Sequence, residues 1–122
     1  METRKELQRH YAEMPKRGGI FLITNTVTGK VLLGSSSNLH GPLNKHRFML
    51  ATDGHPNKAL QRDWKALGEA SFTLEIAESF KHRPGEPDFD LEGELALLEE
   101  IWIEKLNPFD GHGYNLDRHI RE

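Results

Sequence analysis

The stretch that decides the fold is residues 19–34, GIFLITNTVTGKVLLG. Its two ends, residues 19–24 and 30–34, are rich in the β-branched, aromatic and aliphatic side chains that strands prefer. Residues 25–29 between them are turn formers and have the length of a hairpin connection. The stretch predicts an antiparallel hairpin at the centre of a sheet. Both strands are almost continuously apolar, so we expect both faces of the sheet to be covered.

Helical segments are predicted on both sides of this hairpin. Residues 2–13 are good helix formers. After the hairpin, apolar side chains and His46 recur at helical spacing from residue 39 to residue 50. That helix begins either at Asn38 or at Pro42, because proline is tolerated only in a first turn. A further helix is expected over residues 56–67, between Pro56 and Gly68.

The second half of the chain predicts one strand and one long helix. Residues 72–76 alternate between apolar and polar side chains, as in a strand with one wet face. Residues 81–90 contain two prolines and a glycine and are expected to form a loop. The strongest helix spans residues 91–106, where Leu91, Leu95, Leu98, Trp102 and Leu106 form an apolar stripe.

The predicted element order is therefore α-ββ-αα-β-α. This order indicates an α/β sandwich with a small, about three-stranded antiparallel sheet flanked by helices. The length of 122 residues suits one domain, which we assign to residues 1–122 with a core over about 18–116.

Composition excludes several classes of protein. The chain has no cysteine, which rules out disulfides, thiolate zinc sites and a cysteine nucleophile. No apolar run approaches the length of a transmembrane helix, and the charged residues after Met1 do not resemble a signal peptide. We therefore expect a cytoplasmic protein with no membrane partner.

The net charge of −3 hides an uneven distribution. Residues 1–65 contain 11 Lys or Arg against 5 Asp or Glu, whereas residues 66–122 contain 5 against 14. The first part thus carries +6 and the second −9. Such asymmetry suggests a nucleic-acid or metal-phosphate face, although solvated charges can also segregate by chance.

A few polar residues stand out as candidates for chemistry. Glu99 flanks the apolar stripe of the last helix, where a carboxylate must be paired, hydrated or bound to a cation such as Mg²⁺. Position alone fits an ordinary surface glutamate as well. His46 shares a face with leucines, which is typical of a hydrogen-bonded boundary histidine, and none of the seven histidines has a zinc-site spacing. The three serines after Gly34 are interpreted as helix-capping residues.

Five short motifs follow one another in a fixed order along the chain. They are residues 19–21 (GIF), 31–36 (VLLGSS), 55–64 (HPNKALQRDW), 99–108 (EEIWIEKLNP) and 113–115 (GYN). Together they resemble the GIY-YIG nuclease family over roughly residues 18–116. The resemblance implies that family's fold and phosphodiester hydrolysis as the activity to test.

The resemblance also assigns roles to positions. The family uses a glutamate that holds one divalent metal, two tyrosines that position or activate water, and an arginine that stabilises the phosphoryl charge. The glutamate falls at Glu99, and Mg²⁺ is the implied cofactor. The two tyrosines are replaced by Phe21 and Leu32, and the arginine by Pro42. Glu99, Asn115 and His46 are retained, and His55 lies where family members carry a histidine.

We therefore expect a GIY-YIG-like domain with a degenerate site that binds nucleic acid, primarily DNA, with weak or no hydrolysis. The alternative is an active Mg²⁺-dependent endonuclease with a rearranged site built from Glu99, His46 and Arg47. A protein-interaction module, with a protein partner, is the second alternative. The residues expected to contact nucleic acid are Arg17, Lys30, Lys45, Arg47, His55, Lys58, Arg62 and Asn115.

Overall fold

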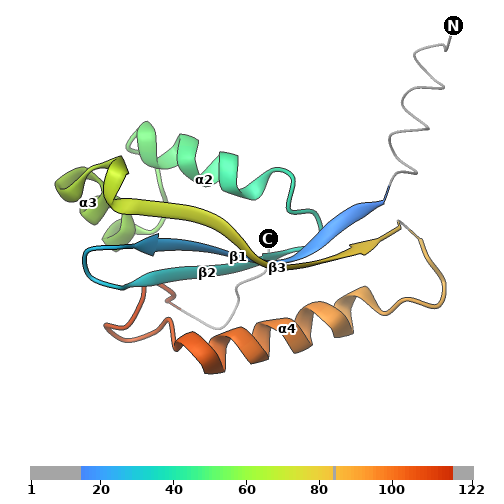
Figure 1. Ribbon diagram of the computed structural model, residues 1–122. Helices are drawn as coiled ribbons and strands as arrows, with labels where there is room; N and C mark the ends of the chain where they lie inside the picture. The colour runs from blue at the N-terminus through green and yellow to red at the C-terminus, as the bar shows by residue number, and fades with distance from the viewer. Residues whose placement is uncertain (1–14, 84, 117–122) are drawn as a thin grey trace, which may run out of the picture.

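The centre of the molecule is a three-stranded antiparallel sheet (Figure 1). The computed structural model describes residues 15–83 and 85–116, so the helix predicted over residues 2–13 lies outside the described residues. The elements, in chain order, are β1 (Lys16–Asn25), β2 (Val31–Ser36), α2 (Pro42–Ala51), α3 (Lys58–Leu67), the 3-10 turn η1 (Glu69–Ser71), β3 (Phe72–His82) and α4 (Leu91–Leu106). In the part of the chain described, no helix is long and apolar enough to cross a membrane.

The predicted hairpin is confirmed as β1 and β2, which pair in antiparallel register from Gly19 opposite Ser36 to Thr24 opposite Val31. The strand order is β2-β1-β3, so β1 occupies the centre while β2 is an edge strand. The prediction that the hairpin lies at the centre of the sheet is therefore right for its first strand, β1, and wrong for its second strand, β2.

Helices cover both faces of the sheet, as the apolar strands predicted (Figure 1). On one face α2 and α3 pack over a cluster that includes Ile23, Leu50, Leu60 and Trp64. On the other face α4 packs Leu98 against a second cluster. Alternate residues of β1 thus belong to two separate cores.

Helix boundaries follow the capping chemistry of the sequence. Helix α2 begins at Pro42, which decides between the two predicted starts. Helix α3 begins two residues later than predicted, because the Asn57 side chain accepts a hydrogen bond from Leu60 N (3.0 Å) and caps the helix. Helix α4 spans the predicted residues and ends at Asn107, which is left-handed (φ 43°).

Strand β3 is six residues longer than predicted and takes up the start of the expected loop. Ile20 pairs with Glu78 and Phe21 with Ile76, so Ala77 is an extra residue in the strand, a β-bulge. The bulge breaks the polar–apolar alternation on which the prediction depended. Beyond it, residues 78–82 continue to pair with β1.

Candidate active site

Glu99 is anchored on the face of the sheet covered by α4. It is half-buried, one position past the buried Leu98. Its Oε1 accepts a hydrogen bond of 2.7 Å from the hydroxyl of Ser35, a fully buried residue of β2. The interpretation of the three serines as helix caps is therefore wrong: Ser35 bonds to Glu99, and helix α2 begins after Gly41 without a hydrogen bond from a capping side chain. The strand period could have found it, because Ser35 is two residues from Leu33 and so shares its face.

The surroundings of Glu99 fit a hydrated magnesium ion better than a metal held wholly by protein. Within residues 15–83 and 85–116 there is no group of three or more histidine or acidic side chains placed to hold a metal. Mg²⁺ is commonly bound by one or two carboxylates together with waters and substrate phosphate oxygens. Glu99 supplies one carboxylate, so the fit depends on oxygen ligands brought by a substrate.

His46 and His55 form a buried pair on the opposite face, between α2 and the loop before α3. Asn57 N donates to Nδ1 of His55 (3.0 Å), so the proton of neutral His55 lies on Nε2. This Nε2 is 2.8 Å from Nδ1 of His46 and donates to it, which leaves the proton of neutral His46 on its own Nε2. His46 therefore presents a hydrogen-bond donor, and not a base, at Nε2.

Phe21 connects the histidine pair to the sheet. Its side chain is 0% exposed, and its ring centroid is 5.3 Å from that of His46. It pairs across the hairpin with Gly34, where a Cβ would lie 2.7 Å from the Cε1 atom of the phenyl ring. The ring thus occupies the space that the missing side chain at residue 34 leaves open.

The two polar clusters approach β2 from opposite faces. Gly34 contacts Phe21 beneath the histidine pair, whereas the next residue, Ser35, holds Glu99. Successive residues of a strand face opposite ways, so the clusters are neighbours along β2 and are separated by the sheet.

The three positions where the resemblance implies catalytic side chains, Phe21, Leu32 and Pro42, carry no polar side-chain group. Leu32 is half-buried and packs against the cluster under α2 and α3. Pro42 is the first residue of α2. Arg47 is exposed and follows the buried His46, so it projects about 100° further around the helix. The structure does not bring Arg47 together with Glu99 and His46 into one site.

Asn115 and Tyr114 serve to close the edge of β2. Tyr114 N donates to Val31 O (2.8 Å), and the Asn115 amide both accepts from Leu33 N and donates to Leu33 O, each at 2.8 Å. Gly113 allows this approach, because a Cβ there would lie 2.5 Å from Val31 O. Both polar ends of the Asn115 side chain are therefore engaged by β2, which does not support the expected contact with nucleic acid.

Tyr114 is fixed in the core beneath α3. Its hydroxyl donates to Asp63 Oδ2 (2.7 Å) and accepts from Asn25 Nδ2 (3.0 Å). Burial, together with the neighbouring Asp63 carboxylate, raises the pKa of Tyr114 to about 12. Tyr114 therefore has a structural role: its neutral hydroxyl joins Asp63 of α3 to Asn25 of β1. Its ring is buried and is not available to stack on a base.

The expected basic residues gather mainly on one face. Lys45 and Arg47 on α2 and Lys58 and Arg62 on α3 are exposed, on the helices that cover the same side of the sheet. Helix α2 contains no acidic residue, and the single acid of α3, Asp63, is bonded to Tyr114. The three remaining residues lie elsewhere: Arg17 near the start of β1, Lys30 in the hairpin turn, and His55, which is buried.

Helix α4 carries the opposite charge on the opposite face. It contains five glutamates and one lysine. The charge asymmetry along the sequence thus corresponds to an asymmetry between the two sides of the sheet. Helices α2 and α3 carry basic residues on one side, and helix α4 carries acidic residues on the other.

This arrangement, a β2-β1-β3 antiparallel sheet with two helices on one face and one on the other, is the fold of the GIY-YIG nuclease catalytic domain. The catalytic domain of the homing endonuclease I-TevI is 31% identical, with 82% of this chain and 98% of that chain covered and a TM-score of 0.58. A glutamate-to-alanine mutant of the catalytic domain of intron endonuclease I-TevI is 28% identical, with 87% and 99% covered and a TM-score of 0.62. By this likeness the chain belongs to the GIY-YIG family of domains. A scan against protein-family models and a search of the curated proteins found no match.

Proposed function

We propose that this domain binds nucleic acid, primarily DNA, through the face covered by α2 and α3, and that it hydrolyses phosphodiesters weakly or not at all. The observation that carries the proposal is the chemistry at three positions. Phe21 and Leu32 have no hydroxyl, and Pro42 has no guanidinium, at the positions where the family has two tyrosines and an arginine.

The physical argument concerns the charge that develops on the phosphate. Hydrolysis of a phosphodiester needs a group that takes up a proton and cations that offset the growing negative charge. A divalent ion held by Glu99 would supply one positive charge centre and acidify a bound water. The residues at 21, 32 and 42 add neither a proton acceptor nor a second cation. Loss of one such group typically costs on the order of a hundredfold in rate.

Binding asks less of the protein than catalysis does. The exposed cations of α2 and α3 are Lys45, Arg47, Lys58, Arg62 and Lys65, and the last is paired with Asp53 at 3.1 Å. Contacts from lysine and arginine to phosphate supply much of the affinity for nucleic acid without reading its sequence. The basic face therefore supports binding even where the hydrolytic groups are missing.

A second candidate function, an active endonuclease with a rearranged site, is favoured by the survival of both polar clusters. Ser35 still holds Glu99, and His46 still pairs with His55. Two features weigh against it: His46 presents a donor at Nε2, and Arg47 projects away from the buried side of α2. A pure protein-interaction module with no affinity for nucleic acid is a third candidate, and salt-dependent binding to DNA would argue against it.

The test is a cleavage assay of the full chain on single- and double-stranded DNA and RNA with Mg²⁺ or Mn²⁺. We expect weak or no cleavage by the unaltered protein. The triple variant Phe21→Tyr, Leu32→Tyr, Pro42→Arg should gain activity, because it returns two hydroxyls and a guanidinium to the site. Adding Glu99→Gln should abolish that gain, whereas Glu104→Gln, an exposed position on the same helix, should not.

Robust cleavage by the unaltered chain that is lost in Glu99→Gln would overturn the degenerate-site proposal and support the endonuclease. In that case Arg47→Ala and His46→Ala distinguish the rearranged site, because each should reduce cleavage without unfolding the protein. A chain that neither cleaves nor binds DNA at low salt would contradict both functions.

A further inference from the structure

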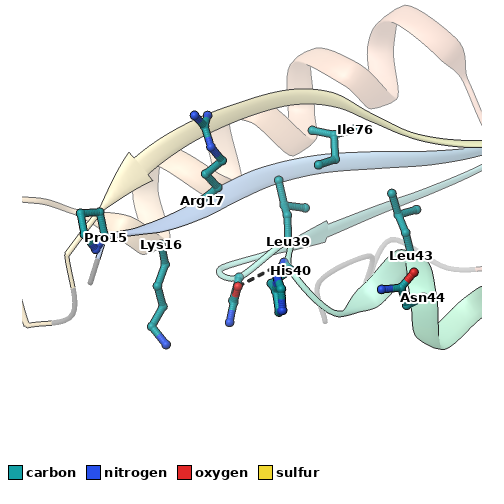
Figure 2. Close-up of a pocket in the computed structure, with 9 residues that line it drawn as sticks. Pro15, Lys16, Arg17, Leu39, His40, Leu43, Asn44 and Ile76 are labelled. Atoms are coloured by element: carbon teal, nitrogen blue, oxygen red, sulfur yellow. Dashed lines mark hydrogen bonds between the residues drawn. The ribbon is translucent and has the colours of Figure 1, made fainter. Parts of the chain in front are cut away.

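The tripeptide Asp-Gly-His occurs twice in the chain, at residues 53–55 and at residues 110–112. In both tripeptides the aspartate is exposed and has a left-handed backbone, with a φ of 63° at Asp53 and 50° at Asp110. Neither tripeptide lines the groove of about 640 Å³ that Figure 2 shows beside the start of β1. The two tripeptides have the same sequence and differ in how the fold holds the glycine amide.

The first tripeptide, residues 53–55, is fixed at the end of α2. Gly54 N donates to Met49 O (2.8 Å), and the neighbouring aspartate carboxylate pairs with Lys65 Nζ at 3.1 Å. The next residue, His55, is 3% exposed, and its backbone N donates to Gln61 Oε1 (3.0 Å). Both the glycine amide and the carboxylate of the first tripeptide are therefore engaged.

The second tripeptide, residues 110–112, belongs to a tight turn between α4 and the segment that covers the edge of β2. His112 N donates to Phe109 O (3.1 Å), and φ is positive at both central residues, 50° at Asp110 and 86° at Gly111. These are the features of a type I′ turn, which Asp-Gly favours. Within residues 15–83 and 85–116, no hydrogen bond holds Gly111 N or the Asp110 carboxylate, and all three residues of the tripeptide are exposed.

We propose that Asp110 and Gly111 are a site of spontaneous isoaspartate formation, and that the fold protects the first tripeptide from the same reaction. Gly111 N attacks the side-chain carboxyl carbon of Asp110. A C–N bond forms, and the carboxyl OH leaves with the amide proton as water, which gives a succinimide. Water then adds across one of the two C–N bonds of the succinimide. Opening next to the original main-chain carbonyl leaves the chain running through the side-chain carbon, whereas opening at the other bond restores aspartate.

The difference between the tripeptides follows from what must break before the attack. The reaction needs a free glycine amide and rotation of the aspartate backbone. In the second tripeptide this rotation disturbs the single turn bond to Phe109 O. In the first tripeptide it must also release Gly54 N from Met49 O and separate the carboxylate from Lys65. We expect the first tripeptide to react at least about tenfold more slowly, because these contacts have to open first.

The modification would alter the connection that positions the segment covering the edge of β2. An isoaspartyl residue adds one carbon to the main chain inside the loop that Asn115 N closes by donating to Pro108 O (3.0 Å). This loop is tightly packed, because a Cβ at Gly113 would lie 2.5 Å from both Pro108 O and Val31 O. We therefore expect the modified chain to hold Asn115 less firmly against Leu33, so that the Leu33 amide exchanges faster.

Incubation of the full chain in heavy-oxygen water at neutral pH tests the proposal, because hydrolysis of a succinimide leaves a heavy oxygen on the residue formed. Trypsin digestion in ordinary water then separates the two tripeptides into the peptides 48–58 and 106–118. Fragmentation of the second peptide should locate the label at residue 110. Label at residue 53 should accumulate at least about tenfold more slowly. The isoaspartyl fraction, isolated by chromatography, should show faster hydrogen exchange at Leu33 than the unmodified chain.

The same chain in concentrated urea is the matched control, because the identical tripeptides then have no fold to protect either of them. In urea the label should appear at residues 53 and 110 at similar rates. In the folded chain, Asp110→Glu should remove the label at residue 110, since attack by the same nitrogen would have to close a larger ring.

Equal labelling of the two tripeptides in the folded chain would overturn the proposal. The same holds for a folded chain that stays unlabelled at residue 110 while the chain in urea is labelled there. Unchanged exchange at Leu33 in the isoaspartyl fraction would contradict the expected effect on the edge of β2.

Discussion

The large ring of Phe21 packs directly against Gly34. It fits there because Gly34 has no side chain. The ring of Phe21 fills the position above residue 34 that a Cβ would occupy. The hydroxyl that the family carries at residue 21 is missing, but the ring still fixes the distance between the hairpin and His46. The Phe21 side chain thus has a packing role at a position where the resemblance implies a tyrosine.

We predict that Gly34→Ala destabilises the protein by about 1–3 kcal/mol, because the added methyl group collides with the phenyl ring. In a Phe21→Ala background the same change should cost far less, since the ring is gone. Urea denaturation of the four proteins in this double-mutant cycle measures the difference.

Gly41→Ala is the control, because a Cβ at Gly41 meets nothing within 4 Å and its φ is −103°. Its effect should be small in both backgrounds. If Gly34→Ala costs the same with and without the Phe21 ring, the close contact is not the cause of the loss.

At the residue scale the sequence predicted which glutamate stands out but not what holds it. Glu99 could be selected because it flanks an apolar stripe. Ser35 was overlooked, since a serine after a strand is also a good helix cap. The pairing of His46 with His55 depends on how α2 turns into α3, which no local pattern specifies.

At the scale of secondary-structure elements, the short segment at residues 113–115 acts as a partial fourth strand. It forms a parallel bridge from Gly113 to Val31, and Asn115 imitates a backbone by offering one donor and one acceptor to Leu33. These bonds satisfy edge groups of β2 that would otherwise be open to pairing with another chain.

We expect Asn115→Ala to lower the free energy of unfolding by about 2–4 kcal/mol, because it leaves the buried N–H and C=O of Leu33 without partners. Leu116→Ala, at the next residue and 85% exposed, should have almost no effect. Chemical denaturation measures both, and hydrogen exchange at the Leu33 amide reports whether the edge opens. Unchanged exchange in Asn115→Ala would mean that the side chain does not protect the edge.

The elements that the sequence predicted well are those whose pattern is set by one physical cause. Helix α4 has a long apolar stripe and the caps Asp90 and Asn107, and its bounds were predicted without error. The predicted range of strand β3 ends too early, at residue 76, because the bulge at Ala77 interrupts the alternation of polar and apolar side chains. The sequence predicts two alternative starts for α2, because Asn38 is a good helix cap and Pro42 is a good first residue of a helix.

At the scale of the whole molecule, the sheet separates two faces of opposite charge. The family likeness alone would not indicate which face meets a polyanion, because Glu99 contacts one face of the sheet and the histidine pair contacts the other. In our proposal the face with α2 and α3 binds nucleic acid, because its exposed lysines and arginines attract phosphates. The glutamates of α4 would repel phosphates on the other face.

We predict that the double variant Lys45→Gln, Lys58→Gln weakens DNA binding and reduces the slope of log affinity against log salt by about 2, since each phosphate contact contributes about 0.9. Lys105→Gln on α4 removes one charge from the acidic face and should change neither quantity. Fluorescence anisotropy across a range of salt concentrations gives both numbers. An equal loss of affinity in Lys105→Gln would mean that net charge, and not a particular face, governs binding.

The hydrogen bonds by which Asn115 covers the edge of β2 also have a consequence for folding during synthesis on the ribosome. The two bonds that close this edge join residues 82 positions apart in the chain. At ribosomal rates of about 5–20 residues per second, Leu33 is made on the order of 4–16 s before its partner exists. During that interval the edge of β2 in the nascent hairpin lacks the two hydrogen bonds from Asn115. We therefore expect this edge to remain open to pairing with another chain until residues 113–115 have been synthesised.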